Sequence, residues 1–353
     1  MRTSLVYHGL LVSLAIVLVY YVFVPSLSAD SWPSFNPDYH LGSEKYYSAY
    51  EEPSDRPLHL VFHGNGLSIF TFRSNGSIEE WDLTRQSLVR TFQSNSIFSY
   101  VASMNSFVTK NAMDNVEIRS LDSGQVTPLA RDFYIHSAVD GSGRLLLLSI
   151  GGPSLEMWKL DDKMLSKTWD AHRPIRNGVA ISTDGKYVAA AEGVYDPVTN
   201  SHQTTVELWN VKHKTPRLLF NGVGDQEAHG VWSLEFSPDA SMIAVDSHVN
   251  RQAGLTVWGT GLGNPIFQVR GLDSHWVRAL AFSPEGKFLA SGDEKGRLIL
   301  WSLKQQRAVW EGTVGEQAIH SITFSPDGQL LAAGIQDSTI QVWDIALSDE
   351  SLD

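Results

Sequence analysis

The 353-residue sequence contains no cysteine. Disulfide bonds, thiolate metal sites and cysteine nucleophiles are therefore excluded. Basic residues are also few, with 27 Lys and Arg against 39 Asp and Glu, which gives a net charge of −12 and leaves no basic cluster. Because so acidic a chain repels phosphate backbones, the composition argues against nucleic acid as a partner.

Catalytic motifs are missing as well. The sequence has no G-x-S-x-G, no H-E-x-x-H and no glycine-rich phosphate loop ahead of a helix. These motifs place nucleophiles, zinc ligands or phosphates at fixed positions in known enzyme classes. We therefore expect a protein that is not an enzyme, and we predict no cofactor.

Residues 5–24 form a long apolar run, and Arg2 is the only charged residue before Asp30. Twenty helical residues span about 30 Å, which is enough to cross a bilayer, so the run predicts an N-terminal hydrophobic helix. Two interpretations remain open: a retained membrane anchor, or a signal peptide cleaved within residues 26–29. In both, the positive charge ahead of the run keeps the N-terminus cytoplasmic and exports the rest.

These features divide the chain into residues 1–29, a signal peptide or signal anchor, residues 30–45, a tether with two prolines, and a folded part at 46–353. Without the first 29 residues the chain has 26 basic and 39 acidic residues, a net charge of −13. This charge argues against adhesion to anionic lipid, so residues 5–24 are the predicted membrane contact. The folded part is expected to be anchored on the extracytoplasmic side, or to be soluble in the periplasm or secreted if the run is cleaved.

The folded part repeats a short strand pattern seven times: IEEWDL at 78–83, VEIRSL at 116–121, LEMWKL at 155–160, VELWNV at 206–211, LTVWGT at 255–260, LILWSL at 298–303 and IQVWDI at 340–345. Apolar and polar residues alternate in each copy, which is typical of a half-buried strand. The second copy has Arg119 where the other six have tryptophan: Trp81, Trp158, Trp209, Trp258, Trp301 and Trp343.

A tight turn precedes most of these strands, for example FSPEG at 282–286 and FSPDG at 324–328. Proline fixes φ in such a turn, and glycine accepts the positive φ that a sharp reversal requires. The last turn residue lies 15 positions before the tryptophan in copies one, three, six and seven. The constant spacing predicts a strand between the turn and the tryptophan strand.

With Trp81-Asp82, Trp343-Asp344, the FSPDG-type turns and a period of roughly 40–45 residues, the chain resembles the WD-repeat β-propellers. The resemblance implies an all-β fold: a seven-bladed propeller of four-stranded antiparallel blades, here preceded by the hydrophobic helix. It also implies that Asp337 is the loop carboxylate that helps to lock a blade. Most copies depart from that polar pattern, so we expect apolar packing between blades to supply more of the stability.

The seventh copy ends soon after Trp343 and leaves no room for a fourth strand. Residues 46–52 include the β-prone segment YYSAY. We expect these residues to complete the last blade and to close the ring, because an open blade edge would leave backbone groups unpaired.

Differences in length between copies predict where binding takes place. The distance from turn to tryptophan is 24 residues in copy four and 18 in copy five, and the following link at 221–230 is also longer. In the propeller architecture these segments share one face, and lengthened loops on a rigid scaffold commonly bind partners. The predicted partner-binding residues there are Tyr195, Asp196, His202, Asp225, Glu227, His229, Trp232, Asp246, His248 and Arg251. A second group on the same face is Trp276, Arg278 and His320.

Two hypotheses for function follow. The first is a non-enzymatic extracytoplasmic scaffold that binds other proteins, as a subunit or assembly factor of a membrane-associated complex. The alternative is a small-molecule or metal site on the face of blades 4 and 5 that serves or performs an enzymatic reaction. His202, His229 and His248 could contribute imidazole ligands to such a site, but their spacing matches no metal motif, and no bound metal is predicted.

Overall fold

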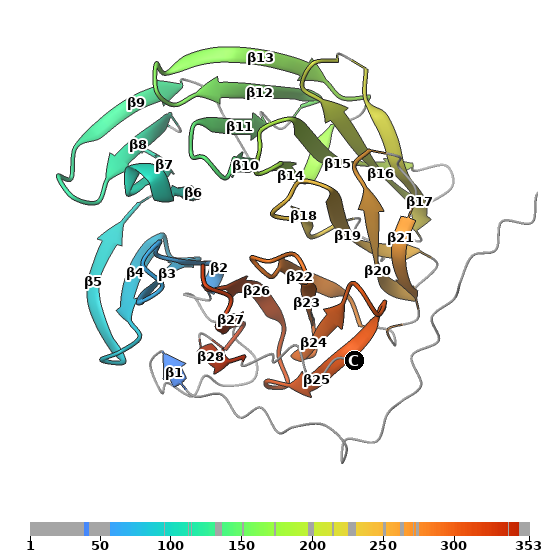
Figure 1. Ribbon diagram of the computed structural model, residues 1–353. Coiled ribbons are helices and arrows are strands. Elements are labelled where there is room, and N and C mark those ends of the chain that lie inside the picture. Colours follow the sequence, from blue (N-terminus) through green and yellow to red (C-terminus); the bar gives the residue numbers. More distant parts are fainter. Residues whose placement is uncertain are drawn as a thin grey trace, which may run out of the picture.

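The computed structural model describes residues 39–41 and 57–345, apart from positions 95, 112, 114, 131–135, 150–151, 173, 197–200, 214, 225–230, 250–251, 262–264, 271, 273–274 and 338. These residues form seven four-stranded antiparallel sheets around a central axis (Figure 1). The predicted seven-bladed β-propeller is confirmed. The hydrophobic helix predicted at 5–24 lies outside the described residues. Within the described part, no helix combines the length and apolar character needed to cross a membrane.

Each blade runs from an inner strand at the axis to an outer strand at the rim (Figure 1). Blade 1 contains β2 (Pro57–Phe62), β3 (Ser68–Arg73), β4 (Ser77–Asp82) and β5 (Ser87–Gln93). Blade 2 contains β6 (Ser96–Val101), β7 (Ser106–Lys110), β8 (Val116–Ser120) and β9 (Val126–Ala130), with the short 3-10 helix η2 (Ala102–Met104) between β6 and β7. Blade 3 contains β10 (His136–Val139), β11 (Leu145–Ser149), β12 (Ser154–Lys159) and β13 (Met164–Asp170).

Blade 4 contains β14 (Ile175–Ile181), β15 (Tyr187–Asp196), β16 (Ser201–Asn210) and β17 (Arg217–Gly224). Blade 5 contains β18 (Leu234–Phe236), β19 (Met242–Val249), β20 (Gln252–Gly259) and β21 (Pro265–Arg270). Blade 6 contains β22 (Val277–Phe282), β23 (Phe288–Asp293), β24 (Arg297–Ser302) and β25 (Arg307–Thr313). Blade 7 contains β26 (Ile319–Phe324), β27 (Leu330–Ile335), β28 (Ile340–Asp344) and β1 (Tyr39–Leu41).

The repeated tryptophans lie on the third strand of their blades, on β4, β12, β16, β20, β24 and β28. Among the described residues, the apolar core divides into seven clusters, and each cluster is shared by two neighbouring blades. Trp301 of blade 6, for example, is completely buried and packs against Phe267 of blade 5. Burial of apolar area at every blade boundary therefore holds the ring together.

The boundary between blades 1 and 2 is filled in a different way, because Arg119 takes the tryptophan position on β8. Arg119 donates a hydrogen bond to Glu117, at 3.2 Å, and pairs across the sheet with Phe107. Phe107 lies at the centre of an aromatic cluster whose ring centroids are 5.1 Å from Phe70 and 5.5 Å from Tyr100. Edge-to-face aromatic contacts thus replace the packing of the missing indole.

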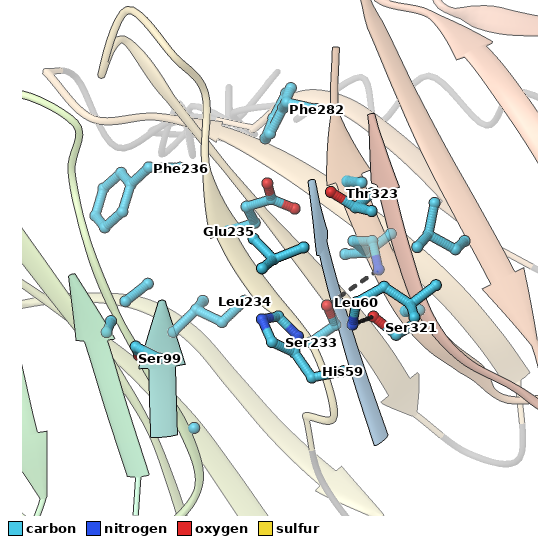
Figure 2. Close-up of a pocket in the computed structure, with 18 of the residues that line it drawn as sticks. His59, Leu60, Ser99, Ser233, Leu234, Glu235, Phe236, Phe282, Ser321 and Thr323 are labelled. Atoms are coloured by element: carbon cyan, nitrogen blue, oxygen red, sulfur yellow. Dashed lines mark hydrogen bonds between the residues drawn. The ribbon is translucent and has the colours of Figure 1, made fainter. Parts of the chain in front are cut away.

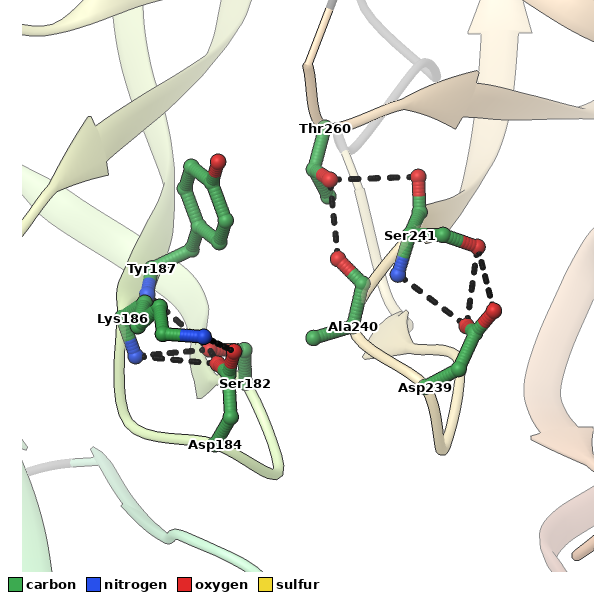
Figure 3. A network of polar contacts seen from close by, with 8 residues as sticks. All are labelled: Ser182, Asp184, Lys186, Tyr187, Asp239, Ala240, Ser241 and Thr260. Atoms are coloured by element: carbon green, nitrogen blue, oxygen red, sulfur yellow. Dashed lines mark hydrogen bonds and ion pairs between the residues drawn. The ribbon is translucent and has the colours of Figure 1, made fainter.

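The tight turns carry a hydrogen-bond pattern that explains their sequence (Figure 3). Ser182 accepts a hydrogen bond from the Tyr187 backbone N–H at 2.9 Å and donates one to Asp184 at 2.8 Å. The same serine-to-backbone bond recurs in three further turns, at Ser237, Ser283 and Ser325. Blade 5 has Ala240 at the glycine position, with φ at 60°, and the Thr260 hydroxyl donates to its carbonyl at 2.8 Å. Side-chain hydrogen bonds therefore shape the turns, and in blade 5 one also bridges to the end of the third strand.

The N-terminal segment closes the ring at a different position from the predicted one. The sequence predicts closure by residues 46–52, but the strand that pairs with β28 is β1, with Tyr39 opposite Val342. This strand lies within the predicted tether, whereas residues 46–52 lie outside the described part of the chain. A second closing contact joins the inner strands of blades 1 and 7, where the Leu60 N–H donates to the Ser321 hydroxyl at 2.9 Å. Residues 39–41, which the sequence assigns to the tether, therefore belong to blade 7.

Candidate functional site

The lengthened segments of blades 4 and 5 consist mostly of strand. In blade 4 the pairing of β15 with β16 continues to Asp196 opposite Ser201, and β17 follows as far as Gly224. In blade 5, β19 and β20 pair as far as Val249 opposite Gln252. Both hairpins thus extend the scaffold itself, and only the short stretches at 197–200 and 250–251 lie between the paired strands.

Asp246, near the middle of β19, joins the blade 5 hairpin to the link from blade 4. Its Oδ1 atom accepts hydrogen bonds from the backbone N–H groups of Trp232 at 2.8 Å and Ser233 at 2.6 Å. The side chain is completely buried, and this burial raises its pKa to about 8, against the opposing effect of the two backbone donors. Asp246 therefore fixes the position of Trp232 at the start of the inner strand of blade 5.

Trp232 and Trp276, which come from two different links, both lie close to one arginine. The Arg278 guanidinium carbon is 4.5 Å from the centroid of Trp232 and 5.8 Å from that of Trp276. Its Nη2 atom lies 3.8 Å from a carboxylate oxygen of Glu294. Trp232 stays 41% exposed. We call Trp232, Arg278 and Trp276 the tryptophan–arginine cluster; it joins one residue from the first predicted group to two from the second.

The cluster borders a cavity of about 830 Å³ that the inner strands of all seven blades surround. Trp232, Arg278 and His320 line it together with several small hydroxyl residues. Two hydrogen bonds of these hydroxyls connect neighbouring inner strands: Ser99 contacts Ser137 at 2.9 Å, and the Leu280 N–H donates to Ser233 at 3.1 Å. The cavity is the central channel of the propeller, and the tryptophan–arginine cluster stands at its wall.

Glu235 from β18 and His59 from β2 are among the titratable side chains that face this channel (Figure 2). Burial raises the pKa of Glu235 to about 8, although the Phe282 backbone N–H donates to its carboxyl. Desolvation by the surrounding channel wall also lowers the pKa of His59, although its side chain is exposed to the channel. Both shifts favour the neutral form, as expected for groups that protein partly desolvates. Glu235 and His59 therefore add a carboxyl and an imidazole to the channel wall in forms that carry little charge at neutral pH.

The other predicted site residues lie on separate elements or outside the described part of the chain. His320 lines the channel, while Asp337 accepts a hydrogen bond from the Thr339 backbone N–H at 3.0 Å in the turn of blade 7. Tyr195, Asp196, His202 and His248 lie on the extended strands β15, β16 and β19. The remaining predicted residues, Asp225, Glu227, His229 and Arg251, lie outside the described part of the chain.

No group of three or more His, Asp or Glu side chains within the described residues could hold a metal ion. His229 lies outside these residues, and the side chains of His202 and His248 are likewise not described. Their predicted contribution to a metal site therefore remains a prediction.

Glu235, Glu294 and His59 were not among the predicted site residues. All three belong to repeat copies whose inner strands or adjoining turns look ordinary in the sequence. An acidic residue inside the apolar pattern LEF at 234–236 was the one available signal for Glu235. Contacts between blades, which sequence spacing does not give, assemble the rest of the site.

Comparison with known proteins matches the family described as "WD domain, G-beta repeat" over residues 266–302 and 304–344, which are most of blade 6 and of blade 7. Nuclear distribution protein PAC1 of Arthroderma benhamiae is 24% identical over 186 residues, which cover 48% of this chain and 38% of that protein. WD repeat-containing protein SL1-17 of Schistosoma mansoni is 25% identical over 173 residues, 48% of this chain and 51% of that protein. The matches thus span about half or less of these relatives.

The repeat matches and the seven four-stranded blades agree with each other. The chain is a seven-bladed β-propeller that contains WD repeats in blades 6 and 7. Human WD repeat and SOCS box-containing protein 1 is also similar, at 33% identity over 106 residues, which cover 30% of this chain and 24% of that protein.

Blade 4 has a distinct polar network that runs from the exposed His172 to buried carboxyl groups. The His172 ring contacts the Glu207 carboxylate, and Thr205 donates a hydrogen bond to Glu192 at 3.1 Å. Burial, and then the hydrogen bond to Glu207, raise the pKa of Glu192. The network connects the link before blade 4 to β15 and β16, and thus supports the base of the lengthened hairpin.

Proposed function

We propose that this WD-repeat propeller is a non-enzymatic scaffold that binds another protein at the mouth of its channel, on blades 5 and 6. The observation that carries the proposal is the tryptophan–arginine cluster, in which the 41% exposed Trp232 stacks on Arg278. Tryptophan and arginine dominate the energetics of protein interfaces, because they combine a large apolar area with directed polar groups. Asp246 holds Trp232 in place before binding, which reduces the entropy lost on association.

The family context supports the same conclusion. A rigid ring of blades presents links and hairpins without needing to change shape, which suits a binding surface. The two lengthened hairpins add extended strand next to the cluster, on blades 4 and 5. Together they offer a partner a broader surface than the cluster alone.

We further propose that the propeller lies on the extracytoplasmic side of a membrane, as a subunit or assembly factor of a membrane-associated complex. The apolar run at 5–24, preceded by Arg2, supports export with the N-terminus inside. The net charge of −13 on the rest of the chain supports attachment through this run rather than through adhesion to anionic lipid.

Exchanging Trp232 for alanine is expected to reduce recovery of the partner at least tenfold when the tagged full-length chain is isolated from detergent-solubilised membranes. A tenfold loss corresponds to about 1.4 kcal/mol, the lower range for an interface tryptophan. The matched control is Leu67→Ala, because Leu67 is also apolar and 59% exposed but lies in a turn of blade 1. Recovery of the same stoichiometric partner with both variants, or no such partner with the wild type, would count against the scaffold.

The proposed location can be tested separately by thiol labelling, because the sequence has no cysteine that would give background. A single Leu67→Cys variant of the full chain is expected to react with a membrane-impermeant maleimide in intact cells, since the exposed side chain at 67 is then outside the cytoplasm. The unmodified chain, which has no thiol, is the control for background labelling. Labelling that requires cell lysis would refute the extracytoplasmic location.

A further inference from the structure

Resting on the proposed function, we infer that Arg278 recognises a single carboxylate of the partner protein, an Asp or Glu side chain that lies next to an apolar residue.

The guanidinium of Arg278 lies over two indole rings, at 4.5 Å from Trp232 and 5.8 Å from Trp276. Stacking occupies the flat faces of a guanidinium and leaves its N–H groups directed outward in the plane. An acceptor that approaches in this plane can take two parallel hydrogen bonds, which is the geometry of a carboxylate. The two tryptophans thus orient the arginine before any partner arrives.

Arg278 lacks an acceptor in the described part of the chain. Its Nε atom is buried and has no hydrogen-bond partner there. The carboxylate of Glu294, at 3.8 Å from Nη2, is beyond hydrogen-bond distance. Asp246 directs Oδ1 at two backbone N–H groups instead. A cation whose donors are left unsatisfied is costly, so an external acceptor would stabilise this arrangement.

The surroundings favour a carboxylate over a phosphate. Glu294 lies 3.8 Å from Arg278 and 3.9 Å from His275, so the cation is already partly balanced. A phosphate group carries nearly two charges and would be repelled more strongly by the Glu294 carboxylate. Phosphate sites commonly gather several arginines, whereas this cluster contributes one. The exposed indole of Trp232 supplies the apolar surface for the residue beside the partner's carboxylate.

The test uses four pools of labelled nine-residue peptides with blocked ends, in which the central residue is Glu, Gln, phosphoserine or Lys and its neighbours vary among Leu, Phe and Ala. Retention on the immobilised full-length protein is measured for the wild type, Arg278→Met and Arg278→Lys. We expect the Glu pool to be retained about tenfold more than the Gln pool by the wild type. Methionine keeps the packing against the indoles but removes the charge, so this preference should vanish in Arg278→Met. Lysine cannot form the two parallel bonds, so Arg278→Lys should keep only part of the preference.

Several results would overturn the inference. Equal retention of the Glu and Gln pools, including no retention of either, would remove the carboxylate as the recognised group. Stronger retention of the phosphoserine pool would assign the site to phosphate instead. Thermal unfolding of both variants checks that the propeller is intact. If Trp232→Ala loses the cellular partner while Arg278→Met keeps it, the scaffold function is supported and carboxylate recognition by Arg278 is refuted. If the wild type retains no partner at all, the proposed scaffold function is refuted.

Discussion

Replacing Trp301 with alanine is expected to lower the free energy of unfolding by about 3 to 5 kcal/mol, the range for deleting a buried tryptophan. Trp301 is completely buried at the boundary of blades 5 and 6, with its ring centroid 5.7 Å from that of Phe267. Its indole N–H donates a hydrogen bond to the Ser291 hydroxyl at 2.8 Å. The variant thus leaves a cavity and an unpaired buried hydroxyl in the same place. Urea denaturation followed by circular dichroism measures the change.

Two matched variants show whether burial is the cause. Trp301→Phe keeps much of the ring volume and loses the hydrogen bond, so its cost should be roughly 1 to 2 kcal/mol. Trp232→Ala removes an exposed indole and should cost less than about 1 kcal/mol. A loss for Trp301→Ala no larger than that for Trp232→Ala would show that the blade boundaries do not stabilise the ring as described.

The repeat pattern predicts the fold well because each copy carries the same two physical signals. A half-buried strand requires alternation, and its tryptophan packs into the boundary between blades; the turn requires a residue that tolerates positive φ. Copy two is the exception, because it lacks the tryptophan. Arg119 has no indole to offer, and aromatic side chains such as Phe70 and Phe107 fill the same boundary from other strands. Local patterns cannot predict such a replacement, because its members come from two blades.

Ring closure shows a second limit of the sequence. β1 supplies the fourth strand of blade 7, and the choice of this segment depends on the path of the chain around the ring. Residues 46–52 have the stronger β-forming composition, yet Tyr39–Leu41 pairs with β28. The intrinsic β-propensity of a three-residue segment predicts little, because the contacts available at the open edge of the neighbouring strand determine which segment pairs there.

The candidate site was predictable in part. Trp232, Asp246, Trp276 and Arg278, which the structure brings together, were all among the residues predicted from the sequence. The contact of Arg278 with two indoles was not predictable, because the three residues meet at the boundary of blades 5 and 6. Glu235 escaped prediction for a related reason: its unusual proton affinity comes from the enclosure of the channel.

Stability is expected to fall as the pH rises from about 5 to about 8. Burial raises the pKa values of Glu235 and Asp246 to about 8, from ordinary values of 4.5 and 3.8, and also raises that of Glu192. In this window the folded chain holds protons that the unfolded chain has released, so the stabilisation is complete below the unfolded pKa and is lost as the pH climbs through the folded one. Each group should contribute roughly 1 to 3 kcal/mol. Urea midpoints at pH 5, 6.5 and 8 measure the slope.

Glu235→Gln separates the contribution of the channel carboxyl from the rest. Glutamine keeps the shape of the protonated acid and can still accept the hydrogen bond from the Phe282 N–H, but it never ionises. The variant should therefore match the wild type at pH 5 and exceed its stability at pH 8. His59, whose pKa desolvation lowers, changes stability in the opposite sense below about pH 6.5, but it does so equally in both proteins and cancels in the difference. Glu285→Gln, at an exposed turn, should leave the difference flat. A flat difference for Glu235→Gln as well would mean that this carboxyl ionises in the folded channel as readily as in the unfolded chain.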